Sequence, residues 1–140
     1  MNEYRITDLQ VGMTESFKKK ITYQMVDSFH EMSGDENPLH LDEGFAKAHG
    51  FKDRVVYGLL TSSFISTLGG VYLPGKYCLI QGVESKYLRP VFPGDEITVI
   101  GEIVDIRAEL NYVEIKVTMK NQNGEKVLRG VLKVGLLNEE

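Results

Sequence analysis

The feature that most limits how this chain can fold is a run of 21 residues, Val55 to Gly75, that contains no charged side chain. Its length is close to the roughly 20 residues of a membrane-spanning helix. However, many of its residues are serine or threonine, and it contains several helix breakers: Gly58, Gly69, Gly70, Pro74 and Gly75. A segment this polar and this interrupted indicates a helix from about Gly58 to Leu68 that is buried on nearly all sides inside a soluble fold.

The second half of the chain has the sequence pattern of β-strands. A sheet of such strands could cover the buried helix. Residues 79–88 form one candidate, and Glu96–Arg107 alternates apolar and polar side chains as a half-buried strand does. The next candidate begins at Asn111 and places Val113, Ile115, Val117 and Met119 on one face. Asn123-Gly124 then indicates a hairpin before a last strand, Lys126–Leu137. We therefore expect consecutive strands to pair as an antiparallel meander.

The first part of the chain adds a strand and two helices. Thr14–Ile21 has strand character, Thr22 is suited to an N-cap, and Tyr23–Met32 is expected to be helical up to a C-cap at Gly34. A second short helix is expected over Leu41–His49. Together these patterns predict a single α+β domain over residues 1–140, with a curved antiparallel sheet wrapped around a central helix.

Charge and cysteine content limit the class of protein further. The net charge of -4 gives no global basic surface for nucleic acid. The one cysteine, Cys78, excludes an intramolecular disulfide and suits a reducing compartment. The first five residues lack the apolar core of a signal peptide. We therefore expect a cytoplasmic protein that binds neither nucleic acid nor membrane.

The segment Ser33–His40 carries the strongest chemical signal. It places the carboxylate of Asp35, the carboxamide of Asn37 and the imidazole of His40 within six residues. Pro38 removes a backbone donor and disfavours helical geometry at Asn37, so we expect a non-helical loop that turns Asp35 and His40 to one side. A carboxylate beside a histidine can hold a water molecule and transfer its protons. The same residue types also form ordinary turns, which is the structural alternative.

No metal or cofactor is expected at this segment. Asp35-x-Asn37 begins like a calcium-binding loop, but Leu39 occupies the next ligand position and the required glycine is missing. His30-Glu31 lacks the second histidine of a zinc-protease helix, and no phosphate-binding glycine loop is present. His30 and His49 are interpreted as surface or helix-end residues.

Three segments together resemble the MaoC-like dehydratases, the (R)-specific enoyl-CoA hydratases. They are Phe29–Ala46, with Gly34-Asp35-Glu36-Asn37-Pro38-Leu39-His40 at its centre, the stretch Val55–Leu60, and Leu88–Glu96. They occur in the family's order and cover most of the chain. The resemblance implies the hot-dog fold and, for the activity, (R)-specific hydration of trans-2-enoyl thioesters or the reverse dehydration, in acyl-CoA and fatty-acid metabolism.

The resemblance also implies roles for individual residues. Asp35 and His40 would be the catalytic pair, and Asn37 would help to form the site. The backbone N–H of Gly58 would stabilise the oxyanion, with glycine required because a side chain would block the thioester. Ser63 would support the site, although its hydroxyl could instead bond a backbone carbonyl of its own helix.

One position departs from the family. Tyr57 stands where the family commonly has a histidine, directly before the glycine. Tyr57 is therefore a candidate for the entrance to the substrate site, with packing as the alternative. The substitution leaves both proposed proton-transfer groups in place.

Three other functions stay open. The substrate carrier could be acyl carrier protein instead of coenzyme A, because basic side chains could meet either: Lys52, Arg54, Lys76, Lys86 and Arg89. The fold also occurs in thioesterases, and a non-catalytic acyl-binding subunit is the third alternative. A sheet wrapped on one helix leaves an edge strand exposed, so we expect a homodimer paired at that edge, with hexamers as a further possibility.

Overall fold

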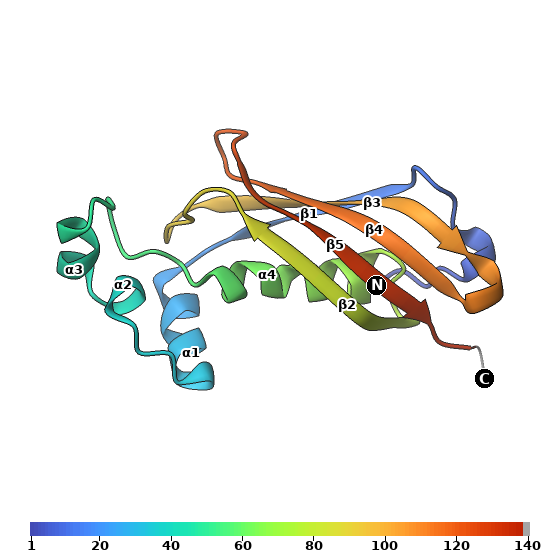
Figure 1. Ribbon diagram of the computed structural model, residues 1–140, viewed down its shortest axis with the longest axis horizontal. Helices are drawn as coiled ribbons and strands as arrows, with labels where there is room; N and C mark the ends of the chain where they lie inside the picture. The colour runs from blue at the N-terminus through green and yellow to red at the C-terminus, as the bar shows by residue number, and fades with distance from the viewer. Residues whose placement is uncertain (139–140) are drawn as a thin grey trace.

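The computed structural model describes residues 1–138 and shows an α+β fold, in which a curved five-stranded antiparallel sheet packs on helix α4 (Figure 1). The strands are β1 (Thr14–Lys20), β2 (Cys78–Tyr87), β3 (Glu96–Arg107), β4 (Tyr112–Lys120) and β5 (Lys126–Leu136). The helices are α1 (Tyr23–Ser33), α2 (Pro38–Leu41), α3 (Glu43–Ala48) and α4 (Gly58–Thr67), which continues into a π-helical turn at Leu68–Tyr72.

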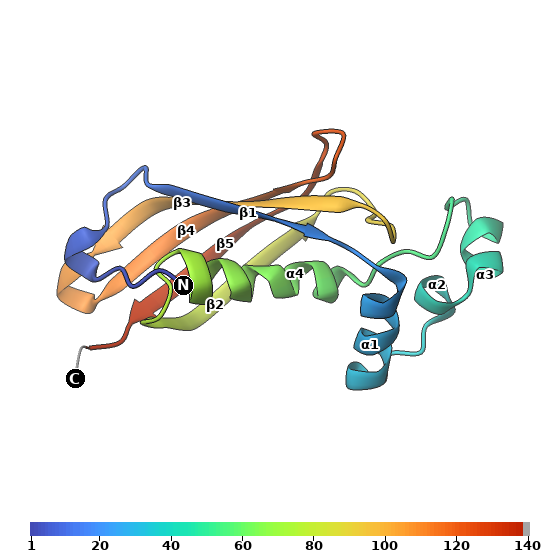
Figure 2. The ribbon, with the colours of Figure 1, turned by 180° about the vertical axis from the view of Figure 1, so that it is seen from behind.

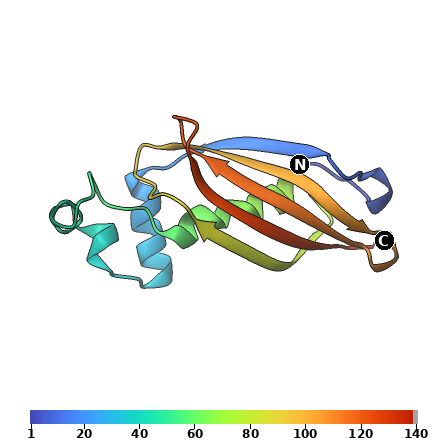
Figure 3. The same cartoon turned by 45° about the horizontal axis from the view of Figure 1, so that its top comes forward.

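The strand order is β1-β3-β4-β5-β2, so the predicted meander is correct for β3, β4 and β5. The hairpin between β4 and β5 turns at Gly124, whose φ of 75° suits glycine. The prediction is wrong for β2, which pairs with β5 and not with its successor β3. A strand has only two edges, and β1 and β4 occupy both edges of β3. Figure 3 shows β1 and β2 at opposite edges of the sheet.

The core lies between α4 and the concave face of the sheet. The apolar face predicted for β4 is confirmed, because Val113, Ile115, Val117 and Met119 are fully buried. Helix α4 contributes Leu60, Phe64 and Ile65 to the same cluster.

Helix α4 begins at Gly58 as predicted, but the prediction that nearly all its sides are buried is wrong. The side chain of Leu59 is 70% exposed, and Ser63 and Ser66 are also exposed. The reason is geometric, since the sheet of one chain covers only one side of the helix (Figure 2). Within residues 1–138, no helix combines the length and the apolar character needed to cross a membrane.

Residues 23–57, here called the helical arm, contain α1, α2 and α3 and extend beyond the end of the sheet at which α4 begins (Figure 1, Figure 2). Helix α1 has the predicted caps: Thr22 Oγ1 accepts from Met25 N–H at 3.2 Å, and Gly34 has a φ of 74°. The prediction of a non-helical backbone through His40 is wrong. Pro38 leaves Asn37 extended, but it then occupies the first position of α2, where a missing N–H costs nothing. The helix predicted over Leu41–His49 is accordingly divided between α2 and α3.

Candidate active site

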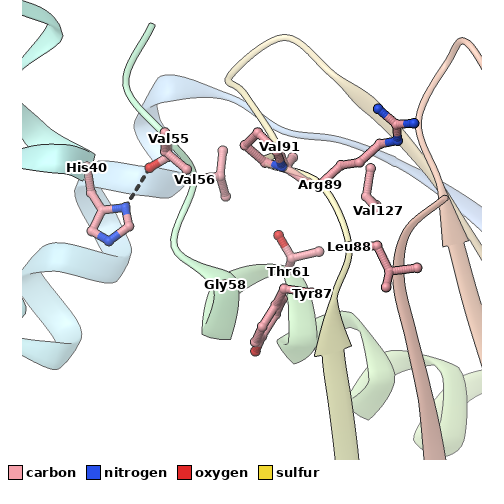
Figure 4. A pocket seen from close by; sticks show the side chains of 11 residues that line it. His40, Val55, Val56, Gly58, Thr61, Tyr87, Leu88, Arg89, Val91 and Val127 are labelled. Carbon is pink, nitrogen blue, oxygen red and sulfur yellow. Dashed lines mark hydrogen bonds between the residues drawn. The ribbon is translucent and has the colours of Figure 1, made fainter. Parts of the chain in front are cut away.

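The imidazole of His40 is held in one orientation and one tautomer. Its Nδ1 lies 2.6 Å from the backbone carbonyl oxygen of Val55 (Figure 4). A carbonyl oxygen only accepts, so Nδ1 must carry the hydrogen and donate it. Nε2 of the neutral ring is then an unprotonated acceptor, as a general base requires. The contact joins α2 to the segment that leads into α4.

Tyr57 lies between the two residues of the predicted catalytic pair. Its ring stacks on the ring of His40 with centroids 4.0 Å apart, and its hydroxyl donates to the backbone carbonyl of Asp35. The residue is only 2% exposed, so in this chain it lies in the interior and not at an opening. Burial, followed by the negative charge of Asp35, raises the pKa of Tyr57 above its ordinary value. The phenol therefore stays protonated and remains a donor.

Asp35 lies on an exposed loop ordered by short-range hydrogen bonds. Its Oδ1 accepts from Asn37 N–H at 3.1 Å, and Asn37 Oδ1 accepts from Leu39 N–H at 2.9 Å as the cap of α2. Ser33 Oγ accepts from Asp35 N–H at 3.2 Å. The predicted turn chemistry is thus present at the same residues as the predicted catalytic chemistry. That a water molecule is shared by Asp35 and His40 stays a prediction.

Arg54 ties the helical arm together, a role that the sequence pattern did not indicate. Its Nε donates to the backbone carbonyl of His40 at 2.7 Å, and its Nη2 forms an ion pair with Asp27 Oδ1 at 2.5 Å. The guanidinium therefore links α1 to α2 and holds the backbone that carries the imidazole. No local signal marks this role, because the partners lie 27 and 14 residues away in the sequence.

A pocket of about 310 Å³ lies between the start of α4 and the end of β2 (Figure 4). It brings together His40 and Gly58, whose N–H has no acceptor among the described residues. Asp35 is not among the residues that line it. The remaining lining residues are Val55, Val56, Thr61, Tyr87, Leu88, Arg89, Pro90, Val91 and Val127.

The structure gives a packing reason for glycine at position 58. A β-carbon there would lie 3.0 Å from two ring atoms of Tyr87, closer than ordinary contact. The Tyr87 hydroxyl is hydrogen-bonded to Ser62 Oγ at 2.6 Å, which fixes the ring against the first turn of α4. Tyr87 was not predicted as a site residue, and nothing in its local sequence marks it.

Ser63 lies on a different side of α4 from this pocket. It lines a separate groove between α1 and α4, together with Met25, Phe29 and Phe64. Its Oγ donates to the backbone carbonyl of Leu60 at 2.5 Å, which is the structural alternative given for this residue. The structure therefore does not bring Ser63 together with His40 and Gly58.

No cluster of three or more histidine, cysteine, aspartate or glutamate side chains suited to a metal ion is found in residues 1–138. The polar groups near the pocket are suited to proton transfer and hydrogen bonding. His40 supplies an acceptor, the Gly58 N–H supplies a donor at a helix N-terminus, and Asp35 supplies a carboxylate on the adjoining loop.

Comparison with known proteins gives consistent matches. The family model described as MaoC like domain matches residues 9–125. The chain is 34% identical over 122 residues to an (R)-specific enoyl-CoA hydratase of Aeromonas caviae, covering 87% of this chain and 91% of that protein. It is 38% identical over 102 residues to a 3-hydroxybutyryl-CoA dehydratase of Methylorubrum extorquens, covering 73% of this chain and 65% of that protein.

Solved structures agree with these sequence matches. An unliganded R-hydratase of Pseudomonas aeruginosa superimposes with a TM-score of 0.90 at 30% identity, covering 96% of this chain and 86% of that one. The R-hydratase of Aeromonas caviae involved in PHA biosynthesis superimposes with a TM-score of 0.88 at 33% identity, covering 92% and 98%.

Proposed function

Because this chain belongs to the MaoC-like domain family, we propose that it is a hydro-lyase acting on acyl thioesters. It hydrates trans-2-enoyl thioesters to (R)-3-hydroxyacyl thioesters and catalyses the reverse dehydration. The observation that carries the proposal is the pocket that brings together His40, whose Nδ1 is held by the Val55 carbonyl, and the N–H of Gly58, which has no acceptor among the described residues. The Aeromonas caviae relative is an (R)-specific enoyl-CoA hydratase, which agrees with the proposal.

The proposed mechanism assigns one task to each group. Water is a poor nucleophile, so a base must remove a proton as the water oxygen attacks the β-carbon. Asp35 and His40 hold this water, accept its proton and return a proton to the α-carbon. Such acid–base assistance typically contributes about 10²–10⁴-fold in rate. Asn37 helps to form this part of the site, whereas Ser63, whose hydroxyl bonds the carbonyl of Leu60, has no part in it.

The negative charge that develops on the thioester oxygen needs a separate donor. The N–H of Gly58 points from the N-terminus of α4, where the unpaired backbone donors and the helix dipole favour an anion. One such donor contributes roughly 3 kcal/mol to the stabilisation of an oxyanion. The reaction needs no redox cofactor because no electrons are transferred.

A homodimer would cover the part of the site that a single chain leaves open. Strand β2 is an edge strand, and its side chains Leu79, Val83 and Tyr87 are each about half exposed. An unpaired apolar edge is a pairing surface. Because Tyr87 also lines the pocket, antiparallel pairing of two β2 strands would place each pocket next to the interface. A hexamer would be an assembly of such dimers.

The direct test follows the loss of ultraviolet absorbance of crotonyl-CoA, longer enoyl-CoAs and a crotonyl carrier protein. The wild-type protein should hydrate at least one of them, and the product should be the (R)-3-hydroxyacyl thioester by chiral analysis. Asp35→Asn and His40→Gln should each lower the rate about 10²–10⁴-fold. Rates unchanged in both variants would refute the assignment of the catalytic pair.

A specific observation favours acyl carrier protein as the alternative carrier. The chain is 30% identical over 127 residues to a mitochondrial 3-hydroxyacyl-acyl-carrier-protein dehydratase of Arabidopsis thaliana, covering 89% of this chain and 75% of that protein. The carrier-protein substrate in the same assay decides between the two. Thiol release without hydration would identify a thioesterase, and binding without turnover would identify a non-catalytic acyl-binding subunit.

The domain boundaries and the location belong to the same proposal. We assign residues 1–140 to one MaoC-like hot-dog domain, because the five strands, α1 and α4 contribute to one core or pack against it. A reducing compartment such as the cytoplasm suits the single free thiol, Cys78.

A further inference from the structure

Thr61 carries a buried hydroxyl without a partner. The residue is 2% exposed, and its Oγ1 has no hydrogen-bond partner among residues 1–138. A threonine inside a helix usually donates to the carbonyl four residues earlier. That carbonyl belongs to Tyr57 and already accepts from the N–H groups of Leu60 and Thr61, at 3.1 and 3.2 Å. Leaving a buried hydroxyl unpaired is costly, so its position needs an explanation.

The hydroxyl faces the pocket that contains His40 and Gly58. Figure 4 shows its oxygen directed away from α4 and toward Val91. The walls around it are otherwise apolar, formed by Val56, Leu88, Val91 and Val127. In the same view, Thr61 lies between His40 on one side of the pocket and the exposed side chain of Arg89 on the other. Thr61 therefore places one polar atom in an otherwise apolar part of the pocket wall, and a ligand reaches this covered oxygen once the apolar side chains over it shift.

We propose that Thr61 is a specificity-determining residue whose hydroxyl hydrogen-bonds the amide of the substrate's carrier arm that lies nearest to the thioester. This inference rests on the proposed function. Three residues of helix separate Gly58 from Thr61, which corresponds to about 4.5 Å along the axis. Two methylene groups separate the thioester sulfur from the first amide of the pantetheine arm. A thioester oxygen bound at the Gly58 N–H thus brings that amide to the level of Thr61. A hydrocarbon acyl chain offers no atom that could satisfy the hydroxyl.

The test compares three crotonyl thioesters that differ only in the arm: crotonyl-CoA, crotonyl-N-acetylcysteamine, which keeps the first amide, and S-propyl thiocrotonate, which lacks it. Thr61→Val replaces the hydroxyl by a methyl group of similar shape. It should lower kcat/KM about tenfold for the first two thioesters, mainly through KM, and leave the third within about twofold of wild type. Thr61→Ser, the matched control, keeps the hydroxyl and should retain most of the wild-type kcat/KM for all three thioesters.

The stability of the free protein gives a second measurement. Replacing an unpaired buried hydroxyl by a methyl group should leave Tm equal or higher in Thr61→Val. A clearly lower Tm would reveal a partner within the fold and would overturn the proposal.

The kinetic outcomes separate this proposal from the one on which it rests. An equal loss of kcat/KM for all three thioesters would place the effect of Thr61→Val at the reacting carbonyl or in the fold. No loss for any of them would show that the hydroxyl does not bind the substrate. Either result overturns the role of Thr61 while the hydratase function stands. Absence of turnover of every thioester by the wild-type protein would overturn both.

Discussion

The body of the molecule, formed by the sheet and α4, and the helical arm are stabilised in different ways. The body has a continuous apolar core in which whole strand faces are fully buried. The arm has only two completely buried residues between positions 23 and 54, Val26 and Ala46, and is held by single polar contacts. Three of these contacts converge on the catalytic candidates: His40 with Val55, Arg54 with His40, and Tyr57 with Asp35. The difference teaches that the apolar packing that stabilises the fold and the polar contacts that orient Asp35 and His40 reside in separate parts of the chain.

The largest effects are expected from two substitutions, one in each region: one should lower kcat and the other should lower stability. His40→Gln in the arm should lower kcat by about 10²–10⁴-fold, because a proton-transfer group is lost. Since His40 is only partly buried, the free energy of unfolding of the His40→Gln protein should differ little from that of the wild type. Steady-state kinetics and urea denaturation of the same preparation measure both quantities.

Ile115→Ala in the body is the counterpart. Ile115 is fully buried, so the change should lower the free energy of unfolding by roughly 2–5 kcal/mol through lost apolar contact and a cavity. The folded fraction, assayed at low temperature, should keep its kcat. Loss of kcat in folded Ile115→Ala, or strong destabilisation by His40→Gln, would break the division between the two regions.

An intermediate effect is expected at Arg54. Arg54→Met keeps the aliphatic stem but removes the donors to the carbonyl of His40 and to Asp27. The imidazole then loses its fixed backbone, and kcat should fall about tenfold with little change in KM. Asp27→Asn is the matched control, because it removes the exposed ion pair, worth about 0–1 kcal/mol, and leaves the bond to His40. Equal kinetic losses in both variants would assign the effect to the ion pair instead.

A smaller effect is expected at Tyr57. Tyr57→Phe keeps the stacking on His40 and removes the hydrogen bond to the Asp35 carbonyl, so kcat should fall roughly threefold to tenfold.

The same variant also has a pH signature. Because burial raises the pKa of Tyr57, its contribution to stability is complete below the ordinary value of 10.0 and is lost as pH rises through the raised pKa. Tm of the wild-type protein should therefore fall more steeply than that of Tyr57→Phe above about pH 10. Parallel Tm curves would contradict the burial of an uncharged phenol.

The smallest effect concerns Cys78 in the body. Burial raises the pKa of its thiol from 9.0 to about 11. At pH 8 only about a thousandth of the thiol is ionised, so alkylation should be slow and should accelerate up to about pH 11. Cys78→Ala, treated in the same way, corrects for modification at other sites. Rapid alkylation at pH 8 would show that this part of the body opens more readily than its packing implies.

The fold was predictable to different degrees in the body and in the helical arm. In the body, the alternation of apolar and polar residues predicted the bounds of β3 and the buried face of β4, because successive side chains of a strand point to opposite faces of the sheet. The position of β2 was not predictable, since it depends on β1 already occupying the free edge of β3. In the arm, the caps Thr22 and Gly34 were predicted from local chemistry, whereas α2 was missed because Pro38 begins a helix as readily as it interrupts one.

For the site, the residue types of Asp35, Asn37, His40 and Gly58 were evident from their motifs, and the structure brings His40 and Gly58 into one pocket. Ser63 was expected beside them and instead faces the groove between α1 and α4. Arg54, Tyr87 and Thr61 carry no local signal, because their importance comes from partners that are remote in the sequence.

The sequence by itself determined the family, the apolar faces of the sheet and helix, and the chemical groups offered to a substrate. These properties depend on side-chain identity and short-range periodicity, which a linear chain already contains. Only the tertiary structure decided which tautomer His40 holds, which face of α4 meets the pocket, and that the hydroxyl of Thr61 stays unpaired. Each of these depends on distances between groups that only folding brings together.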